Sequence, residues 1–163
     1  MRSILTIGLG VLLLGASAGT ARAQSKDPLK DITLLLRDPD RDVRRAASYA
    51  LITFPENAPA IPFLIKVLGD PDAQVRDNAI LALSLMYPHD VVEPLGKALK
   101  DADPLTRRNA AVTLGKVRRF TEGALPNLML LLKDKDKDVR QAAHQALRSI
   151  LGVSPRELTG RGY

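Results

Sequence analysis

A pattern of apolar and polar positions with helical spacing returns four times along the chain. Each copy is marked by a pair of aspartates, and the first members of these pairs are Asp38, Asp70, Asp101 and Asp134. They lie 32, 31 and 33 residues apart. A repeat of this length with helix-spaced apolar residues is typical of a helical solenoid, in which each copy is a pair of helices. No strand-like alternation extends over a useful length, so we expect an all-α fold of about four helix pairs.

The first helix of each predicted pair lies upstream of the aspartates. We expect these helices at residues 29–36, 62–68, 94–99 and 126–132. Pro62, Pro94 and Pro126 stand near the predicted starts of three of them, where a missing N–H and a fixed φ are tolerated.

The second helix of each pair follows the aspartates and has a regular apolar face. An aspartate takes the N-cap position in every copy, at Asp40, Asp72, Asp103 and Asp136. Apolar residues predominate at positions 0, 4, 8 and 11 of these helices, counted from Val43, Val75, Thr106 and Val139 as position 0. At about 100° per residue these positions form one face, which we expect to pack on the partner helix and on neighbouring copies.

The stretch Asp-x-Asp-x-x-Val-Arg-x-x-Ala-x-x-Ala-Leu resembles the HEAT-repeat family, in particular the short bacterial repeats of phycobilin lyase subunits. The likeness covers about residues 27–151, and the third copy departs from it at Thr106 and Thr113. The resemblance implies a right-handed superhelix of antiparallel helix pairs, with the second helices lining its concave side. It is specific for fold and unspecific for function.

The first 23 residues have the pattern of a secretory signal peptide. Arg2 is followed by an apolar run over residues 4–14 and by small residues that end in Ala21-Arg22-Ala23. The alternative is an uncleaved membrane anchor, but the apolar run is shorter than the ~20 residues that a spanning helix needs. We therefore expect a signal peptide at 1–23, a repeat domain at 24–152 and a flexible tail at 153–163, in a periplasmic or secreted protein without a stable membrane span.

Composition and charge narrow the function. The 163 residues include 24 basic and 18 acidic side chains, and cleavage after Ala23 would leave 22 basic side chains against the same 18 acidic ones. This mild excess is spread along the chain, so it is weak evidence for a polyanion partner. The chain has no cysteine, which excludes disulfides, thiol nucleophiles and cysteine-based metal sites.

Candidate catalytic chemistry is sparse. His89 lies in a predicted inter-helix segment at residues 87–90, and His144 lies on the second helix of the last copy. Neither has a histidine or glutamate at metal-ligand helical spacing, and no nucleophile elbow or phosphate-binding loop is present. We expect a protein that is not an enzyme and that needs no cofactor or metal.

An arginine recurs one residue after position 0, at Arg44, Arg76, Arg107 and Arg140. Such a row could bind a ligand, but it recurs beside recurring aspartates. A planar guanidinium can bridge carboxylates or the carbonyls at turn ends, so we favour a structural ladder between adjacent repeats.

The positions that vary between copies are better candidates for binding. Positions 2, 5, 6 and 9 of the second helices lie opposite the predicted packed face, and they have an apolar centre with polar and basic edges. The candidate partner-binding residues there are Arg45, Tyr49, Ile52, Asp77, Ile80, Leu81, Ser84, Arg108, Val112, His144 and Arg148. Alternatively, a neighbouring loop or a second copy of the protein covers this face.

Three functions compete. The first is an exported scaffold that binds a protein or peptide in its concave groove. The second, implied by the resemblance alone, is an accessory subunit of an enzyme, such as a bilin-lyase-like factor. The third is nucleic-acid binding, as in HEAT-like alkylpurine DNA glycosylases, which Asp77, Ile80 and Leu81 disfavour because they interrupt a basic surface.

The export signal makes a direct prediction. We expect the mature protein to begin at Gln24, because Ala21 and Ala23 are small residues at the two positions that signal peptidase reads. Intact-mass measurement of protein purified from its native cell tests this. Recovery of the chain in a membrane fraction with Met1 retained would contradict it.

Overall fold

The computed structural model describes residues 28–53, 58–119 and 121–152, and every regular element in these ranges is helical. The elements are α2 (Pro28–Leu35), α3 (Arg41–Ile52), η1 (Ala58–Ala60), α4 (Ile61–Lys66), η2 (Val67–Gly69), α5 (Ala73–Leu85), α6 (Pro88–Ala98), α7 (Pro104–Val117), η3 (Glu122–Ala124), α8 (Leu125–Leu131) and α9 (Lys137–Leu151). The three η elements are short 3-10 helices. The predicted signal peptide and tail lie outside the described residues.

The second helices of the repeats begin where the aspartate pairs predicted. Asp72 is extended, and its side chain accepts hydrogen bonds from the backbone amides of Gln74 and Val75. The equivalent aspartates also cap their helices through the side chain, at Asp40, Asp103 and Asp136. Such caps satisfy amides that have no partner within the helix. The predicted N-caps are confirmed in all four copies.

The first helices agree with the prediction in the first and last pairs and differ in the third. There α6 begins at Pro88, and Pro94 lies inside the helix. The prediction that Pro94 starts the helix is therefore wrong, because Pro88 already fills the position where proline is best tolerated. The prediction that His89 lies between helices is wrong for the same reason, since His89 is in the first turn of α6.

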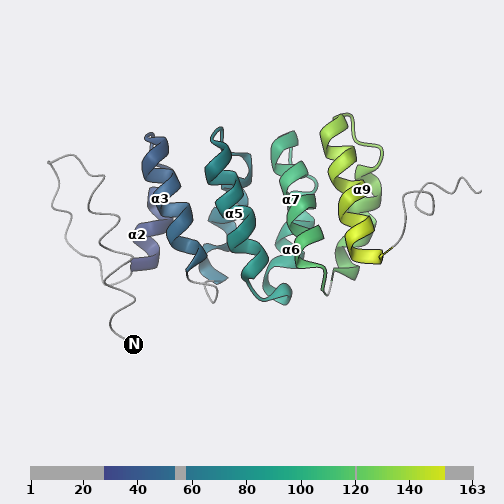
Figure 1. Ribbon diagram of the computed structural model, residues 1–163, viewed down its shortest axis with the longest axis horizontal. Coiled ribbons are helices and arrows are strands. Elements are labelled where there is room, and N and C mark those ends of the chain that lie inside the picture. The colour runs from purple at the N-terminus through teal and green to yellow at the C-terminus, as the bar shows by residue number, and fades with distance from the viewer. Residues whose placement is uncertain (1–27, 54–57, 120, 153–163) are drawn as a thin grey trace, which may run out of the picture.

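The four helix pairs stack in a row to form an all-α solenoid. Figure 1 shows α3, α5, α7 and α9 side by side in one layer, and each contacts the next. The first helices form a second layer, in which α6 lies behind α7. Among the described residues, no helix is long and apolar enough to cross a membrane.

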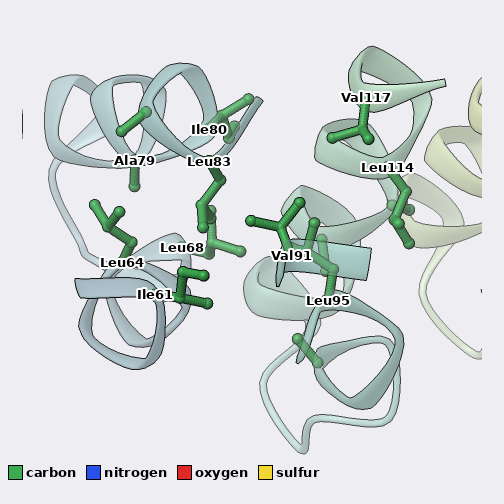
Figure 2. Close-up of a cluster of buried hydrophobic side chains, with 14 of the residues drawn as sticks. Ile61, Leu64, Leu68, Ala79, Ile80, Leu83, Val91, Leu95, Leu114 and Val117 are labelled. Atoms are coloured by element: carbon green, nitrogen blue, oxygen red, sulfur yellow. The ribbon is translucent and has the colours of Figure 1, made fainter. Parts of the chain in front are cut away.

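The core lies between the two layers and uses the predicted positions. Position 4 is a fully buried alanine and position 8 a buried leucine in every copy, at Ala47, Ala79, Ala110 and Ala143 and at Leu51, Leu83, Leu114 and Leu147. Figure 2 shows Leu83 pointing from α5 toward Leu68 of the first-helix layer. At position 0, Val75 and Val139 are fully buried, whereas Val43 is half-buried.

Helices α7 and α9 approach closely at a glycine. A Cβ atom on Gly115 would lie 3.0 Å from the Cα of Ala146. The hydroxyl of Ser149 donates to the Gly115 carbonyl at 2.8 Å, which ties the two helices together at the same point. Position 9 of the third copy therefore belongs to a helix–helix contact.

Removing core volume at position 8 should destabilise the array. We expect Leu83→Ala to lower the free energy of unfolding by roughly 2–5 kcal/mol, because Leu83 is fully buried between the layers. The matched control is Leu85→Ala on the exposed side of α5, which should cost less than about 0.5 kcal/mol. Chemical denaturation followed by circular dichroism measures both. Equal losses would contradict this assignment of the helix faces.

Candidate functional site

Two of the recurring arginines join neighbouring repeats through bidentate ion pairs. Nε and Nη2 of Arg44 donate to the two carboxylate oxygens of Asp70, at 2.8 and 3.1 Å. Arg107 binds Asp134 in the same way, at 2.8 and 2.9 Å. All four side chains are largely buried. Planar two-point pairing of this kind fixes orientation as well as adding energy, so the ladder prediction is confirmed at these two junctions.

The same arginines also close the turn of their own repeat. In every copy Nη1 donates to the carbonyls of the leading aspartate and of the next residue; for Arg107 these are Asp101 and Ala102, at 2.8 and 2.9 Å. The equivalent bonds are made by Arg44, Arg76 and Arg140. These bonds satisfy turn carbonyls that would otherwise be left partly unpaired. The recurring arginine is therefore a structural residue.

The middle junction does not form the ion pair. Arg76 binds the turn carbonyls but no carboxylate among the described residues, and Asp101 is exposed. Instead, the amide of Asn109 on α7 donates to the Leu68 carbonyl at 2.7 Å. A Cβ atom on Gly69 would lie 2.5 Å from a carboxylate oxygen of Asp103, so α7 packs directly on the end of η2. The prediction that the ladder is continuous is wrong at this junction.

A second ion pair reinforces the first junction. Nε and Nη2 of Arg45 donate to the two carboxylate oxygens of Asp72, at 2.9 and 2.6 Å. The Arg45 guanidinium holds the pKa of the Asp72 carboxyl well below its usual range. Arg45 was a candidate partner-binding residue, and the structure places it in this contact between α3 and the N-terminus of α5.

A buried amide that the repeat pattern did not predict also connects α3 and α5. The amide of Asn78 donates to the Ser48 hydroxyl at 3.0 Å and to the Arg45 carbonyl at 3.3 Å. Asn78 and Asn109 occupy the same position in successive copies. An asparagine that recurs on a face of otherwise small apolar residues is the sequence feature that could have predicted both contacts.

The candidate face is narrower than the sequence predicted. Ile80 is only 6% exposed, and its equivalents Ser48 and Ala111 are fully buried. Position 5 turns toward the following second helix, as the contact between Ser48 and Asn78 shows. Because that neighbour covers it, the prediction that Ile80 lines an open groove is wrong.

Position 6 does present apolar side chains to solvent. Tyr49 on α3 is 62% exposed and Leu81 on α5 is 42% exposed, while Val112 on α7 is half-buried. These helices are neighbours in the array, so the residues follow one another from helix to helix. Leu85, one turn after Leu81, is 53% exposed and adds to them. It was missed, although its spacing of four residues from Leu81 pointed to it. We call Tyr49, Leu81, Leu85 and Val112 the exposed apolar row.

The remaining candidates lie around this row or at the end of the array. Ile52, Ser84 and Arg108 are half-buried, and Asp77 is exposed. On α9, His144 is half-buried and Arg148 is exposed. Arg148 lines an open hollow of about 390 Å³ together with Gln145, Ser149 and Gly152. This hollow is on the last helix and is separate from the exposed apolar row.

The other histidine lies on the surface beside an aromatic ring. The rings of His89 and Tyr87 stack with centroids 5.6 Å apart, and His89 Nε2 is 3.4 Å from a carboxylate oxygen of Asp90. Within the described ranges, no three acidic or histidine side chains are grouped so that they could hold a metal ion.

Comparison with known proteins identifies the repeat. The chain matches the family of HEAT repeats over residues 11–84 and again over 61–148. It belongs to the HEAT-repeat family. Among curated proteins, no relative matches it significantly.

Two solved structures share this fold at low sequence identity. The MAST/Orbit N-terminal domain is 18% identical over 98% of this chain and 88% of that one, with a TM-score of 0.69. The complex of CpcE and CpcF of phycocyanin lyase from Nostoc sp. PCC7120 is 21% identical over 82% of this chain and 85% of that one, with a TM-score of 0.58. A third structure, of an engineered protein, is 23% identical with a TM-score of 0.46. That match covers 76% of this chain and 62% of the engineered one.

The ion pair at the last junction should make stability depend on pH. The hydrogen-bonded guanidinium of Arg107 holds the pKa of Asp134 below the usual 3.8. A carboxyl whose pKa is lowered by folding adds stability that is complete above the unfolded pKa and is lost as the pH falls through the folded pKa. We expect this contribution to be constant near neutral pH and to decline below about pH 4.

Two matched variants test this contribution. Arg107→Met leaves the Asp134 charge buried without its partner and should cost about 3 kcal/mol near neutral pH. The cost should shrink at about pH 3, where the carboxyl begins to be protonated. Arg76→Met loses similar carbonyl contacts but no ion pair, so it should cost less and should not vary in this way. Denaturant midpoints at the two pH values decide, and identical behaviour of the variants would contradict the role of the pair.

Proposed function

We propose that this HEAT-repeat chain is an exported, non-catalytic scaffold that binds a protein or peptide partner on the layer of second helices. The exposed apolar row is the observation that carries the proposal. A tyrosine and two leucines on adjacent helices are exposed to solvent and are not part of the buried core. Clustered apolar side chains with polar surroundings are typical of interaction sites.

The chemistry of the row suits an apolar segment of a partner. Tyr49 offers a rigid aromatic surface with a polar tip, and Leu81 and Leu85 lie one helical turn apart on the next helix. Burying one apolar anchor there would gain ~1–3 kcal/mol. The flanking charges of Asp77 and Arg108 would mainly steer association and set the orientation of the partner.

The proposal that the protein is not an enzyme rests on its side-chain inventory. The chain has no cysteine and only two histidines, which lie on different repeats. Export rests on the signal-peptide pattern of residues 1–23. The fold shared with phycocyanin lyase suggests an accessory enzyme subunit as the second candidate, and the export pattern disfavours it.

A single charge in the exposed apolar row should abolish partner binding. We expect Leu81→Asp to prevent capture of the partner because a carboxylate cannot enter an apolar contact without losing its hydration. Helicity and the melting temperature should change little, since Leu81 supports no part of the core. The experiment is a pull-down from the exported fraction, identification of the captured protein, and titration of the purified pair.

The matched control is Leu130→Asp, which introduces the same charge at an exposed leucine of α8 in the other layer. It should leave binding unchanged. Retained binding by Leu81→Asp, or equal loss in both variants, would sink the proposed site. Specific binding of a bilin or of DNA by the purified chain would instead support the alternative functions.

A further inference from the structure

The two ends of the array carry the two halves of the contact that joins repeats inside it. At the last internal junction, the guanidinium of Arg107 donates two hydrogen bonds to the carboxylate of Asp134 in the following repeat. In the same register, Arg140 of the last repeat is the donor for a following repeat. Asp38 of the first repeat is likewise the acceptor for a preceding one.

Arg140 is held in the same way as the paired arginines. Its Nη1 donates to the carbonyls of Asp134 and Lys135, at 2.7 and 3.1 Å. In Arg107 the Nε and Nη2 atoms donate to a carboxylate. The same two atoms of Arg140 have no hydrogen-bond partner within the described ranges. The turn therefore orients this guanidinium and leaves its carboxylate-binding edge open.

Asp38 is the complementary acceptor at the other end. Its Oδ1 accepts the backbone amide of Asp40 at 2.9 Å, just as Asp134 Oδ1 accepts that of Asp136 at 2.9 Å. No basic side chain pairs with Asp38 in the part of the chain that the structure describes. The carboxylate is thus preset in the geometry that receives a guanidinium inside the array.

The packing surfaces at the ends are also incomplete. Gly96 of the third repeat is buried, and its carbonyl accepts the amide of Asn127 in the fourth. The equivalent residue of the fourth repeat, Met129, is 61% exposed. At the opposite end Val43 is half-buried, whereas the equivalent Val139 is fully buried. Each end therefore exposes a surface that a neighbouring repeat covers elsewhere.

We propose that copies of this chain associate head to tail, with Arg140 of one copy on Asp38 of the next. Charge complementarity favours a second copy as the occupant. The unpaired carboxylate of Asp38 and the open guanidinium edge of Arg140 are the two halves of the ion pair that Arg107 and Asp134 form inside the array. The ion pair at its centre makes the contact sensitive to salt, and its heterologous geometry lets the assembly grow with concentration.

Sedimentation velocity of the protein purified from its native cell tests the contact over a wide range of concentration. At low salt the average mass should rise with concentration, and high salt should return it to that of a monomer. Arg140→Asp and Asp38→Arg should each be monomeric, because each places like charges in the contact. A mixture of the two variants should associate again, since each retains the partner that the other needs.

Arg76→Asp is the matched control for loss of fold. Arg76 makes the same two turn contacts as Arg140 but lies at an internal junction. Its variant should lose similar stability and still associate. If Arg140→Asp loses helicity beyond this control, Asp38→Asn takes its place. That variant keeps the acceptor for the turn amide, and it should raise the concentration of half-association about tenfold.

Three results would overturn the proposal. One is a wild-type chain that stays monomeric at low salt at every concentration, as it would if residues 153–163 or another protein covered the last repeat. Another is a mixture of folded charge variants that does not associate. The third is an Arg140→Asp variant that associates as well as the wild type.

Discussion

The start of every second helix depends on one arrangement, an aspartate turn closed by an arginine of the same repeat. In the last repeat, Asp134 accepts the amide of Asp136, and Asp136 caps α9. Arg140 then binds the two carbonyls of the turn. Because this arrangement fixes the first residue of the helix, it fixes the direction of every later side chain. Alanine at position 4 and leucine at position 8 turn inward, and position 6 turns outward.

The parts of the fold that depend on local pattern were predictable. The N-caps, the alanine and leucine core positions and the layer of second helices all follow from residues that recur within each copy. Position 5 was not predictable from one helix alone. A helical wheel assumes one buried arc and one exposed arc, but a second helix in a solenoid has neighbours on both sides as well as a partner behind it. Ile80 is buried by that additional contact, and Leu81 beside it is not.

The middle junction depends on interactions that no single copy encodes. The Asn109 amide reaches a backbone carbonyl of the preceding repeat, and Gly69 permits the approach only because it has no side chain. Both contacts depend on how the repeats pack together, which the sequence of one repeat does not show. The recurring arginine and aspartate, Arg76 and Asp101, are present at this junction but do not pair. The start of α6 was also not predictable from the repeat pattern, because the recurring proline, Pro94, lies inside the helix and Pro88 begins it.

The exposed apolar row and the two ends of the array are different surfaces of the molecule. The row crosses from α3 to α7 along the array, whereas the end contacts lie at its two termini. A head-to-tail neighbour would therefore leave Tyr49 and Leu81 uncovered. In the last repeat the row gives way to Gln145, so a longer assembly would alternate apolar and polar segments along one face. A partner that reached two such segments would gain avidity from the assembly without any new contact within a single chain.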